Sequence, residues 1–143
     1  MKVSKRSSKY AVLGAVIVVV TLAFAGFFNK KKQGVTVDVR VPELSAAALR
    51  GKVAFDTNCA QCHGVNGSGT GNGPPLIHNI YNPGHHSDQA FFIAARRGVR
   101  QHHWPYGNMP KQPQVTEEQI AAIVKYVREL QTANGIVSRP HRM

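Results

Sequence analysis

Cys59-Ala60-Gln61-Cys62-His63 is the stretch that decides how this chain folds. Cys-x-x-Cys-His is the spacing of c-type haem attachment. Two thiols one helical turn apart reach the two vinyl groups on one edge of a porphyrin, and each adds to form a thioether. The histidine that follows then lies under the ring, where its imidazole can bind iron as the proximal ligand. We therefore predict that Cys59 and Cys62 attach one haem c and that His63 binds its iron.

Other uses of a Cys-x-x-Cys pair fit the sequence less well. A structural zinc site needs a second pair of ligands, but the chain has only 2 cysteines, so zinc would have to recruit scattered histidines. A thioredoxin-like redox pair needs a βαβ context, which the pattern of the chain does not contain. A chance match would have to place both cysteines and an adjoining histidine in one pentapeptide. Haem attachment is the interpretation that uses all three residues.

Length and composition are typical of one globular domain with appendages: 143 residues, of which 43% are hydrophobic and 17% charged. The net charge of +11 is unevenly distributed. Residues 1–40 contain eight lysines and arginines against one acid, whereas residues 41–143 contain ten against six. Nucleic-acid binding would require a basic patch within a recognisable fold. Because most of the charge belongs to the N-terminal tail, no nucleic-acid partner is expected.

Residues 1–28 have the pattern of a basic N-terminus followed by a membrane anchor. Tyr10 to Phe28 is a run of nineteen residues without charge. This approaches the ~20 residues that span a hydrocarbon core and exceeds the 7–15 of a signal-peptide core. The small-x-small sequence Ala23-Phe24-Ala25 keeps a cleaved signal peptide as the alternative. Length and the bulky Phe27-Phe28 end favour the uncleaved transmembrane helix.

Residues 29–43 are predicted to be an extended linker. Val35 to Val41 alternate strictly between apolar and polar side chains, the period of a strand with one apolar face. The remainder of the chain has the pattern of helices and loops, which leaves such a strand without a partner in the chain. A strand that packs on a partner subunit is the alternative. A flexible tether of this length has a typical end-to-end distance of ~20 Å, which would keep the domain close to a membrane.

Helical signals begin after the linker. The segment from Leu44 to Asn58 can be capped by Ser45 and carries apolar or small residues near one face. A second helix begins at Ser87 or Asp88 and ends before Gly98, and we expect its inward residues to be Phe91, Phe92 and Ala95.

The last helix has the clearest signal. Thr116-Glu117-Glu118-Gln119 is a capping box. One apolar stripe follows it, made of Ile120, Ile123, Val124, Val127 and Leu130. Asn134-Gly135 ends the helix. Residues 134–143 are predicted to be a basic C-terminal tail that is disordered from Ile136 to Met143.

The haem motif and these helices resemble a small class I cytochrome c over approximately Leu44 to Gln131. The resemblance implies an all-α fold in which the N- and C-terminal helices cross and loops wrap the haem, with the domain at residues 44–133. Gly51 and Phe55 resemble the family's N-terminal helix, where glycine permits close crossing and the aromatic ring packs on the other helix. Tyr126 resembles the aromatic residue at that crossing.

The segment from Gly64 to Gly84 is predicted to be a long loop that wraps a haem face. Within it, Gly73-Pro74-Pro75-Leu76 resembles the family's Gly-Pro-x-Leu segment. The resemblance implies that the carbonyl of Pro74 accepts a hydrogen bond from the proximal imidazole and that Leu76 packs on the ring. Such a bond fixes the tautomer of the ligand and makes it more basic. A plain turn is the alternative.

The chain has 3 methionines, and Met109 is the candidate for the second iron ligand. Met1 precedes the predicted anchor and Met143 is the last residue. Gly107-Asn108-Met109-Pro110 resembles the family's distal Met-Pro segment, in which a thioether raises the reduction potential.

Two histidine pairs, His85-His86 and His102-His103, are the other possible ligands, for iron or for copper or zinc. Trp104 and Tyr106 are expected to line the haem crevice, to donate to a propionate, or to fill the core.

The predicted function is single-electron transfer through one covalent haem c between membrane-associated redox proteins. His63 and Met109 would occupy both sides of the iron, so neither a small-molecule substrate nor enzymatic activity is expected. In the family that the chain resembles, thioethers form outside the bacterial cytoplasmic membrane, so we expect a single-pass inner-membrane protein whose haem domain faces the periplasm. The alternatives are a haem subunit of a periplasmic dehydrogenase or peroxidase, and a haem or metal sensor that uses the histidine pairs.

Overall fold

The computed structural model describes residues 34–140, which form an all-helical domain. Its elements are α2 (Ala46–Asn58), α3 (Ala60–His63), η1 (Val65–Gly67), η2 (Asn79–Tyr81), α4 (Asp88–Arg97) and α5 (Glu117–Ala133). Residues 34–140 contain no strand beyond one isolated bridge, between Val99 and Met109. The predicted transmembrane segment lies outside the described residues, and each helix within them is too short or too polar to cross a bilayer.

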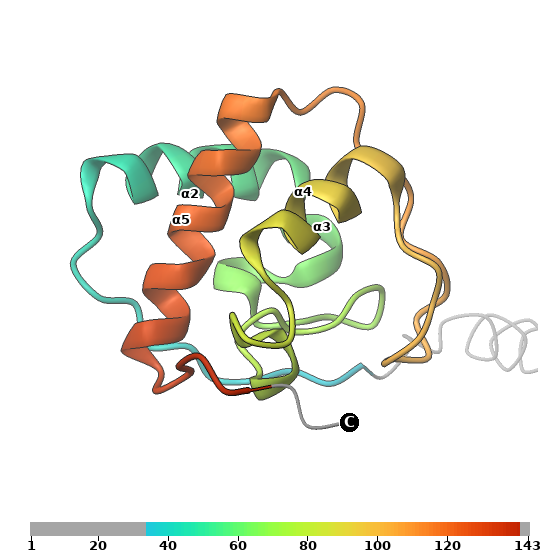
Figure 1. Ribbon diagram of the computed structural model, residues 1–143, viewed down its shortest axis with the longest axis horizontal. Coiled ribbons are helices and arrows are strands. Elements are labelled where there is room, and N and C mark those ends of the chain that lie inside the picture. The colour runs from blue at the N-terminus through green and yellow to red at the C-terminus, as the bar shows by residue number, and fades with distance from the viewer. Residues whose placement is uncertain (1–33, 141–143) are drawn as a thin grey trace, which may run out of the picture. The chain divides into compact units, whose positions relative to one another are not determined.

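Helices α2 and α5 cross at the centre of the domain (Figure 1). The crossing is close at Gly51, where a Cβ atom would collide with the carbonyl oxygen of Ala122 on α5. Next to it, the rings of Phe55 and Tyr126 pack with their centroids 5.6 Å apart and an angle of 60° between their planes. Both rings are fully buried. The crossing that the resemblance implies is therefore present, and glycine is the residue that permits it.

Both crossing helices begin where the sequence predicts. The hydroxyl of Ser45 accepts a hydrogen bond from the backbone N–H of Ala48 at 3.2 Å, which caps α2. The capping box of α5 is complete, since Thr116 N–H donates to Gln119 Oε1 at 2.9 Å and Gln119 N–H donates to Thr116 Oγ1 at 3.2 Å. Glu129, on α5, accepts from the backbone and the hydroxyl of Ser45 at 3.0 and 2.7 Å. This contact ties the start of α2 to the far end of α5.

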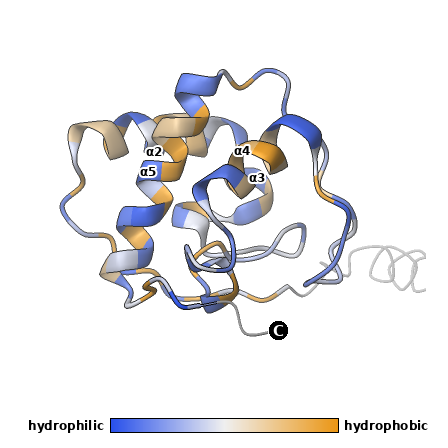
Figure 2. Ribbon diagram, viewed as in Figure 1, coloured by the Kyte–Doolittle hydropathy of each residue, from blue (hydrophilic) through white to orange (hydrophobic). Residues whose placement is uncertain are grey.

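Helix α5 supplies most of the core. Its predicted stripe is buried throughout, and Figure 2 shows hydrophobic and hydrophilic residues following one another along the helix. Helix α4 is only partly buried, and Phe91, Phe92 and Ala95 pack against the core from it, as predicted. The core thus lies between α2, α4 and α5, and it is completed by residues from the loops.

Residues 34–43 are extended, as predicted, but they are not a free linker. The N–H of Val37 donates to the carbonyl of Ser68 at 2.9 Å, and the side chains of Val37 and Val39 pack against the core. The guanidinium of Arg40 donates to the carbonyl of Ala133. The alternating pattern therefore reflects packing on the domain itself, so residues 34–43 are extended but are not part of a flexible tether.

The prediction of a disordered C-terminal tail is wrong for residues 136–139. Ile136 is buried, and its N–H donates to the carbonyl of Gln131 at 2.9 Å. The N–H of Arg139 donates to Asn82 Oδ1 at 3.1 Å. The end of the chain folds back because Ile136 adds apolar area to the core. Residues 141–143 lie outside the described part of the chain.

Candidate cofactor site

A cavity of about 580 Å³ opens between the α2–α3 segment, α4, α5 and the loop that joins α4 to α5. Its size lies within the ~300–1,000 Å³ of small-molecule and cofactor sites. The lining is predominantly apolar and includes Phe55, Leu76, Phe91, Val99 and Val124. Such a cavity suits a large, mainly apolar ligand.

The pentapeptide enters the cavity wall as a helical turn. Cys59 ends α2 and begins α3 with helical backbone angles (φ −118°, ψ −33°), so the chain stays helical from one helix into the next. Cys59 and Cys62 therefore lie three residues apart on one helix face. Cys59 lines the cavity and is partly buried, whereas Cys62 is exposed. Burial, and then the neighbouring Cys62, raise the pKa of the Cys59 thiol to about 11.

His63 lines the same cavity and is oriented by Pro74. Its Nδ1 lies 2.9 Å from the carbonyl oxygen of Pro74. A carbonyl only accepts, so Nδ1 carries the hydrogen and Nε2 keeps a lone pair for a metal. Burial lowers the pKa of His63, an effect that the bond to Pro74 opposes. The contact that the resemblance implies is present, and burial favours the neutral form of the imidazole, which is the form that can bind a metal.

The loop after α3 packs closely against the turn that carries the pentapeptide. A Cβ at Gly73 would approach the carbonyl oxygen of Cys62 to 2.8 Å, so a side chain there would push the loop away from α3. This close approach brings Pro74 beside His63. Leu76 is buried and lines the cavity, as expected of a residue that packs on a ring. The predicted loop is more ordered than its composition indicates, because η1 and η2 form within it.

Met109 lines the cavity from the long loop between α4 and α5. The N–H of Met109 donates to the carbonyl of Val99 at 2.9 Å, and the N–H of Val99 donates back at 3.0 Å. This exchange holds together two segments that run side by side after α4 (Figure 1). The backbone of Met109 is therefore fixed although it lies in a loop.

Trp104 and Tyr106 both line the cavity. The indole nitrogen of Trp104 is buried and has no hydrogen-bond partner among the described residues. Burial raises the pKa of the nearby Tyr81 to about 12, and the proximity of its hydroxyl to the Trp104 side chain opposes this shift, although the two groups do not meet the geometry of a hydrogen bond. The hydroxyl of Tyr106 accepts a hydrogen bond from the N–H of Val35 at 2.7 Å. A buried N–H donor without a partner is the feature expected beside a ligand with acceptor groups.

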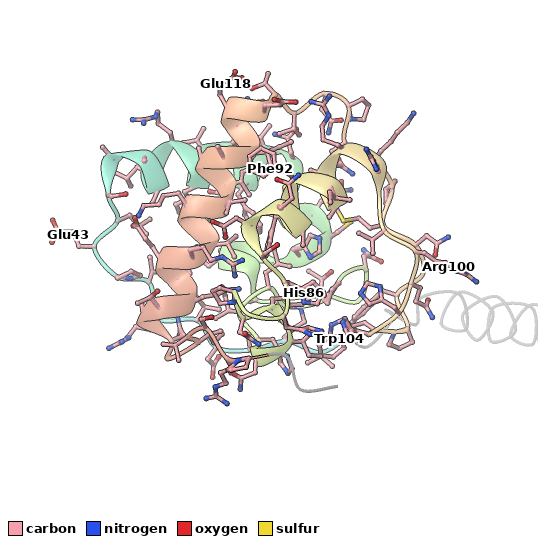
Figure 3. All side chains as sticks on the ribbon, viewed as in Figure 1. Glu43, His86, Phe92, Arg100, Trp104 and Glu118 are labelled. Atoms are coloured by element: carbon pink, nitrogen blue, oxygen red, sulfur yellow. The ribbon has the colours of Figure 1, made fainter. Side chains whose placement is uncertain are left out.

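The histidine pairs gather at one edge of the cavity, where His86, His102 and His103 line it. Figure 3 shows His86 and Trp104 in the same part of the domain, below α4. Burial lowers the pKa of His86; the bond to Ile80 opposes this shift, and the three other histidines of the pairs add to it.

These features match a known family. The model of the family "Cytochrome c" covers residues 48–131 of the chain. The chain belongs to the cytochrome c family. No curated protein has a sequence that matches it. Membership implies a covalently bound haem c, and the Cys59 and Cys62 pair is consistent with its attachment. It also implies haem-based electron transfer with redox protein partners.

The geometry of the cavity is also compatible with a bound haem c. The cavity brings together one thiol of the pair, an oriented imidazole, a thioether and a buried N–H donor. That these groups contact one haem, with His63 and Met109 as its iron ligands, stays a prediction.

Sequence reasoning missed Arg128 and Gln131. Arg128 on α5 donates to Asp88 Oδ1 and to the carbonyl of Tyr81, both at 2.8 Å, and to the carbonyl of His86 at 2.5 Å. Gln131 is buried and donates to the carbonyls of Leu76 and Tyr81, both at 3.0 Å. Together they fasten the loop between α3 and α4 to α5. Both residues lie beside the apolar stripe of the last helix, and this position was the signal in the sequence that could have indicated their role.

Proposed function

We propose that this protein is a single-electron carrier in which His63 and Met109 bind the two sides of one covalent haem c. The supporting observation is that one apolar cavity is lined by Cys59, His63 and Met109. When bound, the haem supplies the one-electron chemistry by cycling its iron between Fe(III) and Fe(II). The protein contributes the environment in which that change takes place.

Each part of the cavity has a role in this proposal. The bond to Pro74 fixes which nitrogen of His63 faces the iron and increases its basicity. The sulfur of Met109 favours Fe(II) and so raises the potential. The apolar walls exclude water, and the indole N–H of Trp104 offers a donor for a propionate. A fixed ligand pair leaves no position open to a substrate, which argues for a carrier rather than an enzyme.

The proposed location is the periplasmic side of the inner membrane, with residues 10–28 as an uncleaved anchor. Two observations support this location. The uncharged run is long enough to approach a membrane span, and in the family that the chain resembles thioethers form outside the cytoplasmic membrane. Redox partners in or near the membrane would exchange electrons with the domain. Membrane fractionation and N-terminal sequencing test this location, and a mature protein that begins at Gly26 would contradict it.

An optical and ligand-binding experiment tests the carrier function. The purified protein is examined oxidised and reduced, and the reduced form is then exposed to carbon monoxide. A carrier with two protein ligands shows a six-coordinate spectrum with a sulfur-to-iron charge-transfer band when oxidised, and it does not bind carbon monoxide. Prompt carbon monoxide binding would instead favour the haem subunit of a dehydrogenase or peroxidase.

A further inference from the structure

Two histidine pairs that are distant in the sequence meet at the edge of the haem cavity. His85 and His86 precede α4, and His102 and His103 lie in the loop that follows it. The rings of His85 and His103 have their centroids 5.1 Å apart, and those of His86 and His103 are equally close. The carrier function proposed above uses none of these side chains.

Three of the four histidines converge. His85, His86 and His103 each offer a ring nitrogen, and these nitrogens all lie within 4.8 Å of one another. The Nε2 atoms of His85 and His103 are 3.1 Å apart. Two imidazole nitrogens that share one tetrahedral ion at ~2.0–2.1 Å would lie ~3.3 Å apart. The observed spacing is therefore close to that of a pair of metal ligands.

His86 is positioned by contacts of its own. Its Nδ1 lies 2.8 Å from the carbonyl oxygen of Ile80, so Nδ1 donates and Nε2 keeps the lone pair. Its backbone carbonyl accepts from the guanidinium of Arg128 at 2.5 Å. A carbonyl that fixes the second nitrogen of a histidine is a recurrent feature of metal sites.

We propose that His85, His86 and His103 bind one divalent transition-metal ion of the copper and zinc class. Imidazole is a preferred ligand of these ions, whereas calcium and magnesium prefer oxygen. Three protein ligands leave a fourth position for water. His102 lies outside the group, because its ring nitrogens are not among those that converge within 4.8 Å of one another.

The position of this site has a consequence for the haem. His86 and His103 line the cavity, so an ion bound there lies at its edge. A positive charge favours the iron state of lower charge, which is Fe(II). Occupation of the site therefore raises the haem reduction potential.

The test is titration of the haem-loaded full chain with zinc chloride by calorimetry. One zinc ion per chain is expected to bind to the histidine group. His103→Ala, at an exposed position where folding is least affected, and His86→Ala are expected to weaken binding by more than about tenfold. The matched control is His102→Ala, the neighbouring histidine outside the group, which is expected to change the affinity by less than about threefold.

A second readout is the haem potential measured with and without zinc, which is redox-inert. Zinc is expected to raise the potential of the parent protein and of His102→Ala, but not that of His103→Ala. Equal loss of affinity in His102→Ala and His103→Ala, or no loss in either, would overturn the assignment. A changed iron-ligand spectrum in metal-free His103→Ala would also overturn it, because His103 would then be an iron ligand.

Discussion

The hydroxyl of Tyr126 donates a hydrogen bond to Asn66 Oδ1 at 2.8 Å. Tyr126 lies at the crossing of α5 with α2, and Asn66 lies three residues after His63. Asn66 is the one residue other than glycine with a positive φ, 56°, among the described residues. Asparagine adopts this left-handed conformation more readily than most other residues with a side chain. The crossing that stabilises the fold is thus bonded directly to the turn that follows the haem motif.

Replacing Tyr126 with Phe keeps the ring that packs on Phe55 but removes this hydrogen bond. We expect the free energy of unfolding to fall by about 1 kcal/mol, measured by urea denaturation of the haem-loaded protein. Asn66→Gly is the matched variant, since glycine accepts the positive φ and also lacks the acceptor. If the bond matters, the two changes together cost less than the sum of each alone. Strict additivity would contradict it.

The two cysteines are expected to be needed for stable haem attachment. Cys59→Ala or Cys62→Ala leaves one thiol for two vinyl groups, so we predict that stable haem c is lost. The measurement is haem that stays with the chain after denaturing electrophoresis. Gln61→Ala, at the exposed position between the cysteines, is the control and is expected to retain haem. A normal two-thioether haem in either cysteine variant would be incompatible with the assignment.

Met109→Ala is expected to leave haem attached but to open one side of the iron. The reduced variant should bind carbon monoxide, and its potential should fall because a soft thioether no longer stabilises Fe(II). Met109→His serves as the comparison, because it should stay six-coordinate while its potential also falls. Optical spectra and redox titration check both. An unchanged spectrum in Met109→Ala would show that another residue binds the iron, with His102 or His103 as the candidates.

Gly51→Ala is expected to destabilise the domain by about 1–3 kcal/mol, because the added methyl group would overlap the carbonyl of Ala122. In an open helix interior the same substitution stabilises by about 1 kcal/mol, so even the sign of the change is informative. Leu49→Ala, at a half-exposed position on the same helix, is the control and should have little effect. Thermal or urea unfolding measures both. A more stable Gly51→Ala would mean that the helices do not cross closely here.

Glu129 is expected to stabilise the fold in a pH-dependent way. Its hydrogen bonds from Ser45, and to a lesser extent the nearby Lys125, lower the pKa of its carboxyl group. The unfolded state therefore binds more protons at mildly acidic pH. The stabilisation is complete above the pKa of the unfolded chain and is lost as the pH falls through that of the folded protein. Glu129→Gln should cost about 1 kcal/mol at pH 7, and the difference should shrink near pH 3.

The pH comparison requires a second carboxylate as its control. Glu43 is exposed, and Glu43→Gln should leave stability unchanged at both pH values. Urea denaturation supplies the measurement. A difference between Glu129→Gln and the parent protein that persists undiminished at acidic pH would mean that the contact with Ser45 is not the cause.

The sequence predicted best what short-range chemistry determines. Ser45 and the Thr116 capping box mark helix starts because their hydrogen bonds reach only three residues along the chain. The role of Gly51 at the helix crossing was predicted only from the family resemblance, because a glycine within a helix does not indicate which other helix packs against it. The docking of Val37 and the burial of Ile136 escaped prediction, because each depends on residues that only the folded chain brings near.

The candidate site divides in the same way. The two thiols and the imidazole of the pentapeptide lie within one helical turn, so their relative positions could be predicted from their spacing in the sequence. The approach of His85 to His103 depends on the course of two loops, and adjacency within each pair does not predict it. Arg128 likewise acts on a loop some forty residues away in the chain. Such long-range contacts carry no periodic signal in a single sequence.

The docking of residues 34–43 changes how far the haem can travel. If residues 10–28 anchor the protein, as proposed, the tether between anchor and domain is not the fifteen residues from 29 to 43. It is the five residues from 29 to 33. Five residues span at most about 17–18 Å even when fully stretched. The bond from Val35 to Tyr106 also places the attachment point beside the loop that carries Met109. With that anchor, the domain would stay within this distance of the membrane surface, so a donor and an acceptor would have to present their redox centres close to that surface.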